Sequence, residues 1–126
     1  MGTTSARVGW LASHAELQAS EQRSWVERYQ TEDIAALQPR HRSRVAGVLR
    51  SVTYAPVGST TALRAELFDG TGSIELCWTG RRDVPGIVPG RRLLATGMVA
   101  RGEARQARLL MFNPRYDLIA TRPGAG

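Results

Sequence analysis

The chain has 126 residues and a formal net charge of +6, so it can hold one domain with a small appendage but not two full-sized domains. All 17 basic residues are arginine, and the lack of lysine excludes a phosphate-binding loop ending in Gly-Lys. The single cysteine, Cys77, excludes an internal disulfide and a cysteine-rich zinc cluster, and it favours a cytoplasmic location. No apolar stretch approaches the roughly 20 residues that are needed to cross a bilayer.

Residues 1–40 are expected to form an N-terminal helical appendage. Capping-box patterns begin at Ser13 and Ser24, and apolar residues between them and residue 30 recur at roughly helical intervals. We therefore predict one helix or a broken pair over residues 13–30, whose aromatic side chains pack on the rest of the chain or dock on a partner. Pro39 ends the appendage, because proline lacks an amide hydrogen and restricts the residue before it.

Residues 41–120 are typical of an all-β barrel, because short alternating apolar runs are separated by glycine and proline. Gly47 lies inside the first run and would allow a bend or bulge. Asp69 and Gly70 mark a tight hairpin, while Pro85 and Pro89 leave room for at most one short helical turn. The predicted strands cover residues 42–54, 63–68, 74–79, 91–100 and about 107–113, and residues 121–126 are expected to be a disordered tail.

The alternation also assigns the strand faces, since successive side chains of a strand point to opposite sides. It points Phe68 outward beside Arg64 and places Trp78 in the core or at a barrel end. The residues predicted to point inward are Leu63, Ala65, Leu67, Ile74, Leu76, Leu93, Ala95, Gly97 and Val99.

Three stretches carry a recognisable pattern: Val45, Gly47, Val48; then Leu67, Asp69, Gly70, Thr71, Gly72, Ile74; then Val88, Pro89, Gly90, Leu93, Gly97, Val99. This pattern resembles OB-fold domains of the anticodon-binding type, which occur in class II aminoacyl-tRNA synthetases, replicative polymerase subunits and a branch-migrating helicase. Residues 34–119 also look like small stand-alone actinobacterial OB-fold proteins. The resemblance implies a five-stranded Greek-key OB-fold barrel that binds nucleic acid, here single-stranded DNA or structured RNA.

OB folds bind oligonucleotides across the outer face of the second and third strands and the loops beside it. On this surface Phe68 would offer a stacking platform for a base, unless it packs on the hairpin flank under the N-terminal helix. The candidate nucleic-acid-binding residues are Arg50, Tyr54, Arg64, Phe68, Arg81, Arg82, Arg101 and Arg105.

The charge distribution agrees with a polyanionic partner. Residues 1–33 carry a net charge of −2, whereas residues 34–126 carry +8. Arginine binds phosphate bidentately and stacks on bases, although a GC-rich genome would produce the same arginine bias without functional meaning. We expect modest affinity dominated by phosphate contacts.

No catalytic constellation is visible in the sequence. His14 and His41 have no cysteine or carboxylate at a spacing typical of a triad or metal site, and nothing supplies a base for Cys77. We therefore expect neither catalysis nor a metal or cofactor.

Two alternatives remain open. The barrel could be a protein-docking module whose partner binds the N-terminal helix. That acidic helix could also cover the strand face and inhibit binding, given the opposite charges of the two segments. The choice between DNA and RNA also stays open, because it depends on contacts to the 2′-hydroxyl.

Overall fold

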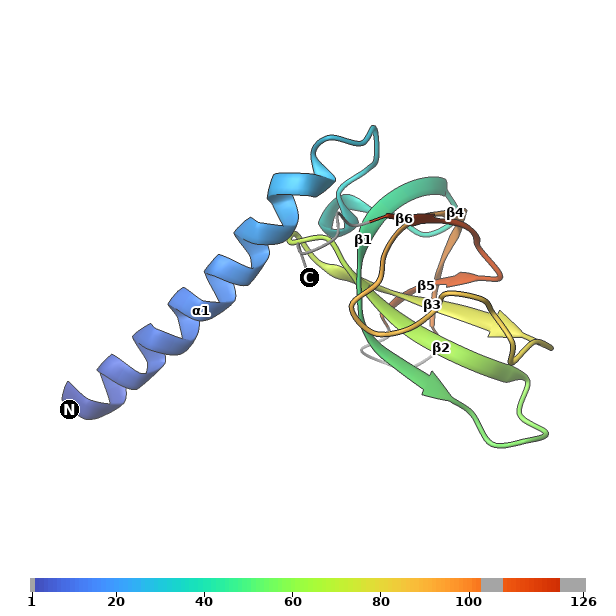
Figure 1. Cartoon of the computed structure of the whole chain (residues 1–126), viewed down its shortest axis with the longest axis horizontal. Coiled ribbons are helices and arrows are strands. Elements are labelled where there is room, and N and C mark those ends of the chain that lie inside the picture. The colour runs from blue at the N-terminus through green and yellow to red at the C-terminus, as the bar shows by residue number, and fades with distance from the viewer. Residues whose placement is uncertain (1, 103–107, 121–126) are drawn as a thin grey trace.

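The computed structural model describes residues 2–102 and 108–120. A long helix, α1 (Gly2–Val26), and a turn of 3-10 helix, η1 (Ile34–Ala36), precede a barrel of short strands (Figure 1). The predicted tail lies outside the described residues. The strands are β1 (Arg42–Tyr54), β2 (Thr61–Phe68), β3 (Ser73–Thr79), β4 (Arg92–Arg101), β5 (Leu109–Phe112) and β6 (Arg115–Ile119).

Five strands close into a ring in the order β1, β2, β3, β5, β4 and back to β1. All neighbours are antiparallel except β3 and β5, which run parallel. This is the Greek-key order of an OB fold, so the predicted fold class is confirmed. The connection between β3 and β4 holds no helix, as Pro85 and Pro89 predicted. The short strand β6, which was not predicted, continues β5 along the same side of β4.

Strand β1 belongs to both halves of the barrel. Its residues Arg42–Val48 pair with β4 and its residues Val48–Tyr54 pair with β2. The register shifts between Leu49 and Ser51, so the bulge lies at Arg50 and not at Gly47. Gly47 serves a different purpose: a Cβ there would lie 2.6 Å from the carbonyl oxygen of Phe68. The missing side chain lets the end of β2 approach β1 closely.

The inward-facing side chains form one core, and every residue that alternation predicted to point inward is buried. Trp78 is only 2% exposed and meets the ring of Tyr116 edge to face at a centroid distance of 5.8 Å. Among the described residues, no buried side-chain nitrogen or oxygen lacks a hydrogen-bond partner. The barrel therefore gains its stability from burial of apolar surface without leaving side-chain polar groups unsatisfied.

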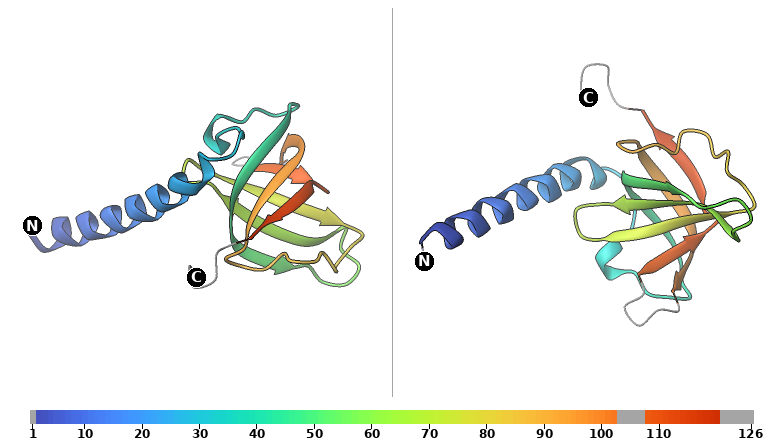
Figure 2. Two further views of the ribbon diagram at one scale, coloured as in Figure 1. Left: turned by 45° about the horizontal axis from the view of Figure 1, so that its top comes forward. Right: turned by 90° about the horizontal axis from the view of Figure 1, so that it is seen from below.

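Helix α1 begins at Gly2, eleven residues before the predicted start at Ser13. Ser24 lies inside the helix and donates its hydroxyl to the carbonyl oxygen of Glu21 at 2.7 Å, so neither serine caps a helix start. Most of α1 projects away from the barrel (Figures 1 and 2). No helix in the described ranges is both long and apolar enough to cross a membrane.

The last turn of α1 packs on the outer face of the barrel. Packing on the rest of the chain was one of the two roles predicted for the aromatic residues of this segment. Trp25 and Val26 are buried against Ala46 of β1 and Leu94 of β4. The guanidinium carbon of Arg92 lies 4.8 Å from the Trp25 ring centre. One half of the outer β1–β4 face is therefore covered by the appendage.

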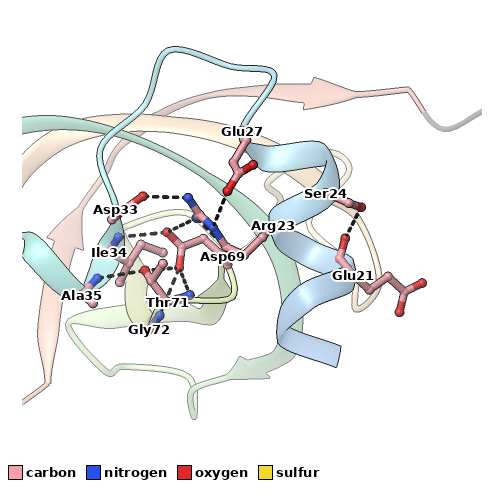
Figure 3. Close-up of polar contacts among 10 residues, drawn as sticks. All are labelled: Glu21, Arg23, Ser24, Glu27, Asp33, Ile34, Ala35, Asp69, Thr71 and Gly72. Carbon is pink, nitrogen blue, oxygen red and sulfur yellow. Dashed lines mark hydrogen bonds and ion pairs between the residues drawn. The ribbon is translucent and has the colours of Figure 1, made fainter. Parts of the chain in front are cut away.

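A buried carboxylate ties the appendage to the β2–β3 hairpin (Figure 3). Asp69 is completely buried and accepts hydrogen bonds from the amide nitrogens of Ile34, Thr71 and Gly72 at 2.9, 2.8 and 3.1 Å. The Thr71 hydroxyl donates a further bond at 2.7 Å, and the Arg23 guanidinium lies 3.5 Å away. The predicted hairpin residue therefore also joins α1, η1 and the barrel.

Candidate nucleic-acid interface

The outer face of β1, β2 and β3 holds three of the predicted site residues: Arg50, Arg64 and Phe68. Arg50 and Phe68 lie toward the β2–β3 hairpin. Tyr54 pairs with the buried Leu63, so its side chain lies on the inner side of the sheet, at the open end of the barrel beside the β1–β2 loop. Arg64 lies on β2 between the two ends. Because α1 packs near the hairpin, it does not cover the Tyr54 end.

At the hairpin end the guanidinium of Arg50 covers the ring of Phe68. The guanidinium carbon lies 3.9 Å from the ring centre, and the same group donates to Glu66 at 2.7 Å and to Ser73 at 2.9 Å. Phe68 is only partly exposed. It is therefore not the open stacking platform that alternation predicted, because the bulge at Arg50 brings a cation over one of its faces.

The centre of this face is close to electrically neutral. Glu66 of β2 lies directly opposite Glu75 of β3. Arg64 is 3.5 Å from Glu75, and Arg108 is 3.8 Å from Glu66. The hydrogen bond from Arg50 holds the pKa of Glu66 below its usual value, against the opposing effect of burial. The cations predicted to bind phosphate here already have carboxylate partners.

At the loop end an exposed ring borders a hollow of about 490 Å³. The Tyr54 side chain is 56% exposed, and the guanidinium carbon of Arg82 lies 5.8 Å from its ring centre. Arg82 also donates to the carbonyl oxygen of Ala55, which holds it beside the loop. The residues that line the hollow are Thr53, Tyr54, Ala55, Pro56, Ser59, Thr60, Thr61 and Arg64. An exposed ring beside one cation, at the edge of a hollow that a second cation lines, is suited to a base and its phosphate.

A second hollow adjoins the first, because Thr61 of β2 pairs with Thr79 of β3. Two hydrogen bonds hold Asn113 against Thr79 in the lining of this hollow. The Asn113 side chain accepts from the Thr79 amide at 2.9 Å and donates to the Thr79 hydroxyl at 2.9 Å. Arg81, a predicted site residue, lines this hollow together with Trp78, Thr79, Asn113, Pro114, Arg115 and Tyr116. Three predicted arginines therefore gather around the loop end: Arg64, Arg81 and Arg82.

Arg101 does not join them. It lies at the end of β4 and lines a different hollow, together with Pro39, Arg40, Met98, Val99 and Ala100. Arg105 lies outside the described residues.

Two exposed apolar side chains were missed by the sequence reasoning. Phe112 of β5 and Met98 of β4 are each 50% exposed. The burial of Met111 places Phe112 on the outer face by alternation, and the burial of Val99 does the same for Met98. Alternation along each strand could therefore have predicted that Phe112 and Met98 point outward, once the inner face of the strand had been assigned.

Cys77 is 1% exposed, and its burial, with a smaller contribution from Glu75, raises the pKa of the thiol to about 11. Because the thiolate is the reactive form, we expect iodoacetamide to leave the folded protein unmodified near neutral pH and to react faster as the pH rises toward that value. Mass spectrometry with and without urea measures this. Rapid alkylation of folded protein at neutral pH would contradict the burial.

No protein-family model and no curated protein matches the chain. Solved structures do resemble it. The OB domain of MM0293 from Methanosarcina mazei is 14% identical, with a TM-score of 0.54 over 72% of this chain and 84% of that one. A chain of a replication protein A heterotrimer bound to single-stranded DNA is 16% identical, with a TM-score of 0.52 over 71% and 76%. At these identities the likeness shows the OB fold alone.

Proposed function

We propose that this protein binds single-stranded nucleic acid without catalysis, with the loop end of the β2–β3 face as its primary contact. The observation that carries the proposal is the exposed Tyr54 ring with Arg82 beside it, at a hollow that Arg64 also lines. A base would stack on Tyr54 while the two arginines approach the neighbouring phosphates.

The location of this hollow supports the proposal. OB folds bind oligonucleotides at the second and third strands and at the loop between the first and second strands, and the Tyr54 hollow lies where these meet. The replication protein A chain that this barrel resembles belongs to a heterotrimer bound to single-stranded DNA. The net charge of +8 over residues 34–126 adds a long-range attraction for a polyanion.

The absence of catalysis is part of the same proposal. In the described ranges, no three His, Cys, Asp or Glu side chains gather as a metal site. Cys77 is buried with a pKa raised to about 11, which argues against a nucleophilic role. The carboxylates of the strand face, Glu66 and Glu75, are held in ion pairs with arginine.

A protein-docking module remains the second candidate, since one observation favours it. Helix α1 contacts the barrel near its C-terminal end, and the side chain of Leu17 is 69% exposed. Helices in proteins gain most of their stability from packing, so a helix that projects into solvent offers its sides to a partner.

Replacing Tyr54 with alanine should weaken binding of a thymidine strand of about 16 nucleotides by about 1 to 3 kcal/mol, because the base loses its stacking surface. Fluorescence anisotropy of the labelled strand measures the change. Tyr54→Phe is the matched control and should bind within about twofold of the unchanged chain, since it keeps the ring.

Arg64→Gln tests the cation at the other side of the hollow, with Arg28→Gln as a control of equal charge at an exposed site. We expect the first to weaken binding more than the second. Equal binding by Tyr54→Ala, Arg64→Gln and the unchanged chain would move the site elsewhere on the barrel.

A further inference from the structure

The outer face of β4 and its neighbours carries a second concentration of arginine, away from the Tyr54 hollow. Thr96 of β4 pairs with Arg44 of β1 on one side and with Arg115 of β6 on the other. Two strand spacings separate these arginines, about 10 Å between their backbones. Two residues further along β4, Met98 pairs with Arg42.

This region is the uncovered half of the β1–β4 face. Trp25 and Val26 of α1 bury the other half at Ala46 and Leu94. Outside the area that α1 covers, Met98 and Phe112 are each 50% exposed. They lie next to each other on β4 and β5, because each adjoins one member of the antiparallel Val99–Met111 pair. Arg40 and Arg101 line the hollow on the far side of Met98.

The charge of this face is not balanced as it is on β2 and β3. Over the described ranges, no side chain of Arg40, Arg42, Arg44, Arg101 or Arg115 takes part in an ion pair within 4 Å or in a hydrogen bond. Two carboxylates lie on nearby segments. The Glu32 backbone amide donates to the carbonyl of Arg44, and Asp117 follows Arg115 by two residues on β6, yet neither side chain pairs with these arginines.

We propose that this face, centred on Phe112 and Met98 and bounded by Arg42, Arg44 and Arg115, is a second contact surface for single-stranded nucleic acid. The inference rests on the proposed function and extends its footprint. Unpaired arginines favour a polyanion over a protein surface of mixed charge, and an exposed ring among them offers a stacking position for a base.

The geometry also provides a route between the two surfaces. Arg115 lines the hollow at Trp78 together with Arg81, and that hollow adjoins the Tyr54 hollow through the Thr61–Thr79 pair. Phe112 is also reached directly across the sheet, because it pairs with Cys77, which in turn pairs with Arg64. A bound strand would therefore cross β3 from Arg64 to Phe112, with Arg81 and Arg115 at the adjoining hollow.

Two sets of variants test the surface in titrations of the full chain with the 16-nucleotide thymidine strand. Phe112→Leu removes the ring and should raise the Kd roughly 5- to 50-fold, whereas Phe112→Tyr keeps the ring and should stay within about twofold. A triple variant, Arg42→Gln with Arg44→Gln and Arg115→Gln, should make the slope of log affinity against log salt shallower by about 2.

The control is the double variant Arg28→Gln with Arg91→Gln, which removes charge from exposed positions outside both surfaces and should change the slope by less than about 1. Unchanged melting temperatures show that each variant is folded. If the unchanged chain binds but Phe112→Leu and the triple variant bind as it does, the second surface is overturned while the proposed function stands. If the unchanged chain binds no strand, both fall.

Photocrosslinking gives an independent readout that needs no variant. A strand carrying bromodeoxyuridine should crosslink to the tryptic peptide of residues 109–115, which contains Phe112. Crosslinks confined to the peptides around Tyr54 and Arg64 would contradict the second surface.

Discussion

Replacing Asp69 with alanine should lower the free energy of unfolding by about 3 to 5 kcal/mol, because it breaks a buried and fully hydrogen-bonded ionic site. The Asp69 carboxylate accepts from three backbone amides and the Thr71 hydroxyl. Without it the amide of Ile34 stays buried with no acceptor, at a further desolvation cost. Arg23, which also donates to the Asp69 carbonyl at 3.2 Å, would lose its ion pair with that residue.

Asp33→Ala is the matched control, since Asp33 binds the same guanidinium of Arg23 at 2.9 Å but is 53% exposed. A half-exposed ion pair contributes only about 0 to 1 kcal/mol. Urea denaturation followed by circular dichroism measures both variants. Losses of similar size would mean that the Asp69 site does not hold the appendage to the barrel as the contacts indicate.

The second large effect is expected for Gly47→Ala, which should cost about 1 to 3 kcal/mol through overpacking. The new methyl group would lie 2.6 Å from the carbonyl oxygen of Phe68 and 2.9 Å from Cγ of Leu67. A backbone carbonyl cannot rotate away as a side chain can, so β1 and β2 would have to separate where β1 passes from one half of the barrel to the other.

Gly97→Ala provides a control within the same barrel. Gly97 is also buried, but a Cβ there would lie 3.5 Å from Pro114 and 3.6 Å from the sulfur of Met111, which is ordinary contact. The change should be neutral or stabilise by up to about 1 kcal/mol through the unfolded chain. Equal melting temperatures for the two variants would show that β1 has more room at Gly47 than the distances allow.

The barrel was the most predictable part, because its information is local. Alternation along β2 alone places Leu63, Ala65 and Leu67 in the core, and β1 begins and ends at the predicted residues. Strand β6 was missed because Asn113, with a φ of 48°, and Pro114 interrupt the run that β5 begins. The pairing of β6 with β4 is a long-range event that no local pattern encodes.

The site was less predictable, because its electrostatics depend on register. The sequence contains Glu66 and Glu75, but only the hairpin pairing places them opposite each other and beside Arg64 and Arg108. The bulge that brings Arg50 over Phe68 has no local signature either. Tyr54 is exposed because it lies at the end of β1, where neighbouring strands do not cover its ring.

The same limit applies to Asp69, which reads as an ordinary turn residue before glycine. Its partners Ile34 and Arg23 are 35 and 46 residues away in the chain. Its second role could therefore be found only after the appendage had been placed on the hairpin.

The central claim, that this barrel binds single-stranded nucleic acid, is tested most directly by the salt dependence of that binding. Anisotropy of the labelled 16-nucleotide strand, and of the matching duplex, would be followed from roughly 50 to 200 mM salt. We expect tighter binding of the single strand, with log affinity falling linearly against log salt by about 0.7 per phosphate contacted. No binding at the lowest salt, or binding that salt does not weaken, would contradict the account and leave the barrel as a protein-docking module.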